Sequence, residues 1–213
     1  MINHNLSAYI FSLILLLLIA HDLKAQKAIQ ISLYPGFTII NSDDFSGVSR
    51  ISQTNRAYGG NVAVNSSLND IPIELSVGYL QGKSRIIEND NSFQNNSVAL
   101  QYRTLPVELL IPIFSPERFK LLTGLNIVAQ HRTLIYNNLD IQDDRLLSFG
   151  IGLSGKASLI LSEINDGNGF IFLNISARWT EFLVHNSRGR DTSDFKYRHF
   201  VISPQLGVSF DLN

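Results

Sequence analysis

Four charged residues lie inside stretches in which apolar and polar residues alternate. They are two acids and two bases: Glu74, Glu108, Lys156 and Arg178. Each falls on the polar side of its stretch, so a shared interior would remove all four from bulk water, where an unpaired charge is costly. We therefore expect opposite charges to pair. Such a cluster could form a path or gate for ions, or a structural plug of salt bridges. We favour the plug, because side chains fill a narrow interior.

A second candidate is the fragment His185-Asn186-Ser187, in which a base and a hydroxyl nucleophile stand two positions apart. Hydrolysis by such a pair needs an acid that orients the imidazole. The next predicted strand contains no Glu, and its one carboxylate, Asp211, is expected at the opposite end of the protein. We predict that the chain has no catalytic residue and is not an enzyme. His185 and Ser187 stay as an alternative rim site.

No metal or cofactor site is expected. The histidines His131, His185 and His199 are the candidates, but their spacing matches no metal-ligand motif. The chain also lacks a glycine-rich phosphate loop and a pair of catalytic carboxylates. Its formal net charge of -1 gives no support to nucleic-acid binding.

Eight segments of period-two alternation must position these residues, and the pattern predicts a strand for each. The predicted strands cover residues 28–40, 57–68, 71–81, 97–113, 119–131, 147–159, 170–182 and 199 onward. The last strand is the most regular. Its apolar positions Leu206, Val208, Phe210 and Leu212 alternate with Gln205, Gly207, Ser209 and Asp211.

The connections between these strands alternate in length. The short ones are Asn69-Asp70, Ser115–Arg118 and Ser162–Gly169, and the long ones are Asn41–Arg56, Gly82–Asn96, Arg132–Arg145 and Val184–Arg198. An even strand count with short turns on one side and long loops on the other is typical of outer-membrane barrels. The pattern places both termini in the periplasm and the long loops outside the cell.

The N-terminus is expected to be an export signal. The run Ile10–Ala20 is apolar apart from Ser12; it is too short to cross about 30 Å of hydrocarbon as a helix, but it suits the apolar region of a signal peptide. Ala25 supplies a small residue before cleavage, so we divide the chain into a signal peptide, residues 1–25, and one barrel domain, residues 26–213. The chain has no cysteine, which excludes disulfides and a lipid-modified N-terminal Cys.

The composition of the two strand faces favours lipid outside and side chains inside. In the segment 147–159 the polar face carries Ser148, Gly150, Gly152, Ser154 and Lys156. Repeated glycine weakens a strand that faces water, whereas a narrow eight-stranded lumen needs small side chains. The alternative is a soluble barrel with an apolar ligand cavity. We predict an all-β fold, an eight-stranded antiparallel up-and-down transmembrane β-barrel in the cell outer membrane.

Aromatic residues near the segment ends are typical of two interfacial girdles. Those toward the loops are Phe37, Tyr58, Tyr79, Trp179 and Phe200, and those toward the turns are Phe119, Phe170 and Phe210. One residue disturbs the pattern, because Arg103 shares the parity of the apolar residues in its strand. Either a bulge near Pro106 resets the register, or Arg103 lies above the hydrocarbon.

Three fragments carry a resemblance to a known family. Leu105-Pro106-Val107-Glu108-Leu109-Leu110 is similar to a central strand, Ala177-Arg178-Trp179 to a late strand, and Gly207-Val208-Ser209-Phe210 to the closing strand. With them, nearly the whole mature chain resembles the small eight-stranded outer-membrane β-barrel domain family of Gram-negative bacteria, also labelled porin-family or PorT-family. The chain departs from the pattern in not ending on an aromatic residue. His185-Asn186-Ser187 is similar to the pair with which some outer-membrane barrels deacylate lipid A.

These observations lead to expectations about partners and role. We expect a monomer in contact with outer-membrane lipid and lipopolysaccharide, assembled by the barrel assembly machinery through its C-terminal strand. The expected role is structural, adhesive or interactive and uses four extracellular loops. The alternatives are an accessory barrel of a secretion or transport assembly, a narrow pore, or a rim lipid A deacylase. No residue pattern indicates a particular protein partner.

Overall fold

The computed structural model describes residues 28–34, 38–43, 51–55, 57–68, 71–86, 98–136, 144–164, 168–187 and 197–211. The signal peptide predicted for residues 1–25, the cleavage before Gln26 and the turn Asn69-Asp70 lie outside the described residues. Within these ranges the secondary structure is β-strand, and no helix is long and apolar enough to span a membrane.

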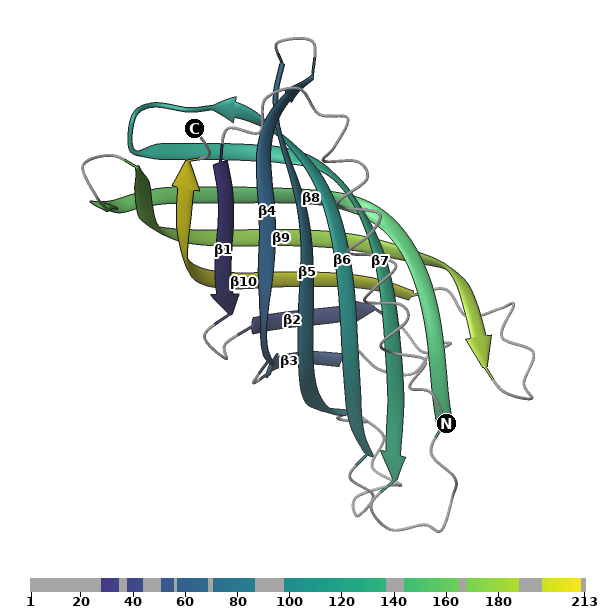
Figure 1. The fold of residues 1–213 in the computed structure, drawn as a ribbon. Helices are drawn as coiled ribbons and strands as arrows, with labels where there is room; N and C mark the ends of the chain where they lie inside the picture. Colours follow the sequence, from purple (N-terminus) through teal and green to yellow (C-terminus); the bar gives the residue numbers. More distant parts are fainter. Residues whose placement is uncertain are drawn as a thin grey trace, which may run out of the picture.

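Ten strand segments form one antiparallel sheet. They are β1 (Ala28–Tyr34), β2 (Thr38–Asp43), β3 (Ile51–Asn55), β4 (Ala57–Leu68), β5 (Ile71–Ile86), β6 (Val98–Phe114), β7 (Phe119–Tyr136), β8 (Asp144–Ile164), β9 (Gly169–Ser187) and β10 (Tyr197–Asp211). Figure 1 shows β4 to β7 on the near side of the wall and β8 to β10 crossing behind them.

These ten segments make eight barrel strands. β1 and β2 follow one another along the same partner, because β10 pairs with β1 through Leu206–Asp211 and with β2 through Arg198–Ile202. β3 and β4 likewise form one strand against them, in a single continuous register. The register of β2 against β10 is offset by two residues from that of β1, because Leu33 pairs with Leu206 and Ile39 pairs with Ile202.

The sheet closes on itself, since β1 pairs with both β4 and β10. Following the partners once around the barrel from Phe200 leads back to β10 at Phe210, a stagger of ten residues. Eight strands with this stagger, a rise of about 3.3 Å per residue and a spacing of about 4.8 Å tilt by roughly 40° from the barrel axis. The predicted closed, antiparallel, eight-stranded fold is therefore confirmed.

Alternation decides which side chains fill this barrel. In β10, Gln205 and Ser209 are buried, whereas Leu206 and Phe210 are exposed. In β8, Ser148, Ser154 and Lys156 are buried, whereas Ile151 and Leu153 are exposed. The polar face points into the lumen and the apolar face points outward, as the glycine and serine content of the polar face predicts.

Two glycines give room to large inward side chains. A Cβ at Gly82 would lie 2.2 Å from the Tyr102 hydroxyl oxygen, and one at Gly207 would lie 2.5 Å from the ring of Phe172. Both aromatic residues are buried. An aromatic ring that packs over a glycine on a neighbouring strand fixes the register of the two strands.

The observed strands extend beyond the predicted ones, which corrects the predicted loop boundaries. β5 continues to Ile86 and β9 to Ser187, and β3 occupies part of the predicted loop 41–56. The reason is that backbone hydrogen bonds continue wherever two strands pair, whereas apolar alternation marks only the part of the strand with an apolar outer side.

The predicted alternative of a bulge near Pro106 is wrong. The register of β6 against β7 is continuous from Val98 to Pro112, and it shifts only between Pro112 and Phe114. Pro106 is buried in the lumen wall, and Arg103 is exposed on the outer face. Arg103 therefore keeps the parity of its apolar neighbours.

Candidate functional site: the charged layer of the lumen

Four strands position the charged residues predicted for the lumen, and β7 adds a further buried charge, Arg132, that the sequence reasoning missed. Glu74 lies on β5, Glu108 on β6, Lys156 on β8 and Arg178 on β9. All four side chains point inward and are at most 6% exposed. Each strand places its charge at an even position, where the alternation of the strand directs side chains into the lumen.

The structure brings the four residues together as two ion pairs. Lys156 Nζ contacts Glu74 Oε1, and Arg178 Nη1 lies 3.4 Å from Glu108 Oε1. In the sheet order, β5 and β8 are three strands apart, as are β6 and β9. Both pairs therefore cross the lumen and connect opposite walls, and the charges of the layer cancel.

Neutral groups complete the hydrogen bonding of Glu108. Ser154 donates to Oε1 at 2.7 Å, and Ser76 donates to Oε2 at 3.3 Å. Asn126 in turn donates to Ser154 Oγ at 3.1 Å, and Thr180 donates to Asn126 Oδ1 at 3.0 Å. A buried charge is tolerated when it is both paired and hydrogen-bonded, and this carboxylate meets both conditions.

Further polar layers fill the lumen on either side of the charges. On one side, Ser32 donates to Gln205 Oε1 at 2.9 Å, and Gln205 Nε2 donates to Ser176 Oγ at 2.8 Å. On the loop side, Gln130 Nε2 donates to Thr104 Oγ1 at 3.2 Å. The sequence pattern places these amides on the polar face, but it does not show that they form hydrogen bonds between strands.

An aromatic layer lies at the same loop-side level. The rings of Tyr102 and Phe182 both lie 6.3 Å from that of His199, and all three side chains are buried. Gln130 Nε2 lies 3.4 Å from His199 Nδ1. The layer adds buried side chains to the lumen on the loop side of the charged pairs.

The chemistry open to the charged layer is limited by its burial. Each carboxylate forms an ion pair with a Lys or Arg side chain, and both are buried away from bulk water. Groups in this state hold strands together and balance charge, whereas an acid or base in catalysis must reach a substrate. The geometry is that of cross-lumen struts.

The histidines do not share a site in the described part of the chain. His199 points into the lumen and His131 points outward, on opposite faces of the wall. The backbone of His185 pairs with Ser148 and that of Ser187 with Leu146; the side chains of the alternative rim site lie outside the described residues. Among the described residues there is no group of His, Cys, Asp or Glu that could hold a metal ion.

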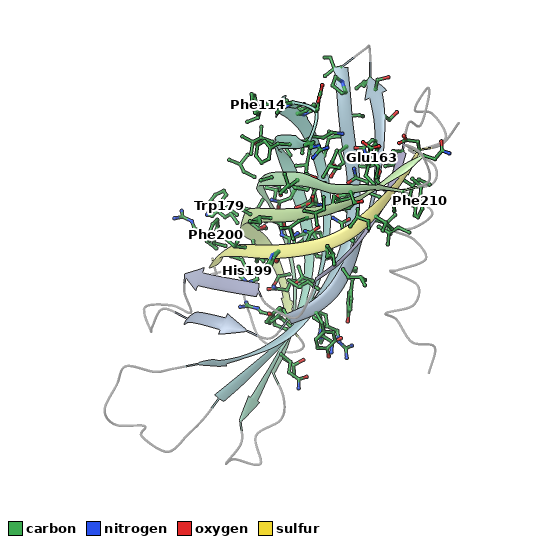
Figure 2. The ribbon with its side chains drawn as sticks, turned by 90° about the vertical axis from the view of Figure 1, so that its left-hand side faces the viewer. Phe114, Glu163, Trp179, His199, Phe200 and Phe210 are labelled. Atoms are coloured by element: carbon green, nitrogen blue, oxygen red, sulfur yellow. The ribbon has the colours of Figure 1, made fainter. Side chains whose placement is uncertain are left out.

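The outer surface carries most of the aromatic residues expected of the girdles, but Phe170 pairs with the inward Ser209 and belongs to the lumen face, so its prediction as a girdle residue is wrong. Trp179 and Phe200 are cross-strand partners, and Figure 2 shows them at one end of β10 with Phe210 at the other. Near the turn 115–118, the rings of Phe114 and Phe119 lie 6.2 Å apart. Of the predicted girdle residues, Phe37 lies outside the described residues.

Comparisons with known proteins give structural similarity only. No protein-family model matches the chain, and no curated protein sequence does. Neisserial surface protein A is similar in structure, with 10% identity over 87% of this chain and 96% of that chain and a TM-score of 0.48. The attachment invasion locus protein of Yersinia pestis has 12% identity over 87% of this chain and 100% of that one, with a TM-score of 0.46. A major outer membrane protein from Thermus thermophilus has 14% identity, coverage of 86% and 99%, and a TM-score of 0.44.

Proposed function

We propose that the protein is an integral outer-membrane β-barrel with a packed lumen, and that it acts without enzymatic activity through its extracellular loops. The role is structural, adhesive or interactive. Membership of the porin-family or PorT-family group is part of the proposal and is supported by the three sequence fragments that resemble it. The observation that carries the membrane assignment is a row of apolar residues at outward strand positions, most of them exposed.

This apolar row runs once around the barrel along successive strand partners. Its members are Phe200, Trp179, Leu153, Leu125, Leu109, Leu75, Val64, Ile29 and Phe210. Leu125 is 62% exposed and Leu153 is 59% exposed, whereas Val64 and Leu75 are buried. The part of the row from Phe200 to Leu109 is exposed, and a soluble protein rarely exposes so many neighbouring apolar side chains, because water against them is unfavourable. Contact with acyl chains removes that cost.

The orientation and assembly follow from the same reasoning. Outer-membrane barrels have short turns in the periplasm and long loops outside the cell. In this orientation both termini of the chain lie in the periplasm. Every strand of the described barrel has a partner on both sides, apart from the short β3, so the wall offers little free edge and supports a monomer. We propose that β10, which closes the barrel, is the strand that the assembly machinery engages.

The packed lumen leads to a prediction about conductance. Two ion pairs and the polar and aromatic layers fill the interior of an eight-stranded barrel, which has room for side chains and little else. We expect the purified full-length protein, inserted into planar lipid bilayers, to show no steady single-channel current. Reproducible unitary conductance that disappears when the protein is omitted would contradict the packed lumen and favour the pore.

The lipid A deacylase is tested separately. The proposal predicts the same lipid A acylation pattern in cells with and without the protein, measured by mass spectrometry. Loss of one acyl chain that depends on both His185 and Ser187 would overturn the absence of enzymatic activity.

A further inference from the structure

A polar row interrupts the apolar outer face near the loop ends of four neighbouring strands. Tyr58, Gln81, Arg103 and His131 are successive cross-strand partners on β4, β5, β6 and β7. All four belong to the outward face, where Tyr58 is 57% exposed and Arg103 is exposed as well. Directly below Arg103 on β6 the outward positions are apolar, beginning with Leu105.

Hydrogen bonds orient the first part of this row. Tyr79 donates to Gln81 Oε1, and Gln81 Nε2 donates to the Tyr58 hydroxyl oxygen at 3.3 Å. The amide of Gln81 therefore bridges two tyrosines and uses both of its ends. The Tyr58 hydroxyl accepts from Gln81, which leaves its own proton for an acceptor outside the protein.

Arg103 differs from Arg198, another exposed arginine of the outward face. Arg198 has a carboxylate partner, because its Nε lies 3.9 Å from Glu181 Oε2. In the described ranges no Asp or Glu pairs with Arg103. A guanidinium beside acyl chains is costly without a counter-charge, so an anion from outside the chain would stabilise it.

The position of Arg103 along the barrel axis indicates where that anion would lie. Arg103 and Phe114 are both on β6, at its loop-side part and its turn end. Eleven residues of strand, tilted by roughly 40°, span about 28 Å along the barrel axis. The apolar band of an outer-membrane barrel is about 25 Å tall. Arg103 therefore lies one band height from the turn-side aromatic residues, at the level of the headgroups on the loop side.

We infer that Arg103, together with the Tyr58 hydroxyl, binds a phosphate group of a lipid A headgroup in the outer leaflet. Arg is suited to this ligand, since its planar guanidinium donates two parallel hydrogen bonds to phosphate oxygens. The two tyrosines suit the interface because a ring can lie in the apolar region while its hydroxyl reaches the headgroups. The inference rests on the proposed outer-membrane location and adds a ligand and a site to it.

The test measures lipid A binding by native mass spectrometry on the full-length protein. The variants are Arg103→Gln, Arg103→Lys and the matched control Arg198→Gln, whose arginine is already paired. Loss of one charge-assisted bidentate contact is expected to weaken binding of bisphosphorylated lipid A about tenfold in Arg103→Gln. Arg103→Lys retains the charge and should lose less, and Arg198→Gln should bind as the wild type does.

Two further measurements on the wild-type protein distinguish the phosphate of lipid A from free inorganic phosphate. The wild type should bind lipid A that lacks both phosphates about tenfold more weakly than the bisphosphorylated form. Inorganic phosphate should not displace the lipid. Equal binding of the two lipids, equal binding by Arg103→Gln and the wild type, or displacement by inorganic phosphate would each overturn the inference.

An insertion control keeps this inference distinct from the proposed function. Trp179 is the single tryptophan of the chain and lies on the outer face. Its fluorescence should be quenched by lipids with brominated acyl chains in every variant. Absence of quenching in the wild type would contradict the membrane location itself. Normal quenching together with unchanged lipid A binding by Arg103→Gln would contradict only the phosphate site.

Discussion

Leu153→Arg is expected to lower the free energy of unfolding in lipid vesicles by about 2 kcal/mol, because an arginine costs about 2–4 kcal/mol at the bilayer midplane of a barrel and less toward the interface, where Trp179, the strand partner of Leu153, lies. Leu153 lies in the middle of β8, is 59% exposed and belongs to the apolar row. An exposed leucine on a soluble surface would tolerate the same change at almost no cost. Equilibrium unfolding in urea, followed by tryptophan fluorescence in vesicles, measures the difference.

A matched control lies in the turn after β6. Glu117 is exposed there, between β6 and β7. Glu117→Arg should change the free energy of unfolding by no more than about 0.5 kcal/mol, as is usual for surface positions. If Leu153→Arg costs as little as Glu117→Arg, the outer face at Leu153 does not contact hydrocarbon.

Arg178→Met should destabilise the barrel by about 3–5 kcal/mol, because it leaves Glu108 as a buried carboxylate without its cation. Glu108 would keep the hydrogen bonds from Ser154 and Ser76, which do not replace a positive charge. The measurement is again urea unfolding in vesicles. The length of methionine limits the loss of packing, so the change reports mainly on charge.

The double variant Arg178→Met with Glu108→Gln separates pairing from packing. It removes both charges and retains an amide that can accept from Ser154, so its cost should be well below the sum of the two single changes. The pair of Lys156 and Glu74 offers an independent repeat of the same cycle. Additive costs in both cycles would show that the four residues do not act as cross-lumen ion pairs.

Alternation carries the largest part of what the sequence can predict. A residue on the polar face of a strand must point to the same side as its neighbours at i−2 and i+2, so the inward direction of Glu74 and Lys156 follows from parity. The same reasoning identifies the outward apolar face and the number of strands. It depends on local spacing alone, which a single chain shows directly.

Contacts across the lumen could not be predicted in this way. Which acid meets which base depends on the stagger of the closed barrel, and Glu74 lies 82 positions from Lys156. The polar strand β3 also escapes detection, since Ile51–Asn55 has no alternating apolar side. Its strand conformation comes from pairing with β2, a tertiary effect.

The bridging amides show the same limit on a smaller scale. Asn126 and Gln130 share the inner face of β7 with other polar residues, such as Arg132, and nothing in the sequence sets them apart. Their importance comes from neighbours on other strands, Ser154 for the first and Thr104 for the second. A buried amide is informative only once its partners are known, because an unpaired one is destabilising.

The most direct test of an outer face in lipid and a filled interior is the environment of residue 153. A single cysteine there is available for a spin label because the native chain has none. In bilayers the label should be accessible to lipid-soluble oxygen and shielded from a water-soluble paramagnetic reagent, while a label at Glu117 in the exposed turn should show the reverse. A label at 153 that is shielded from both reagents, as in a protein core, or open to the water-soluble reagent would contradict the membrane barrel.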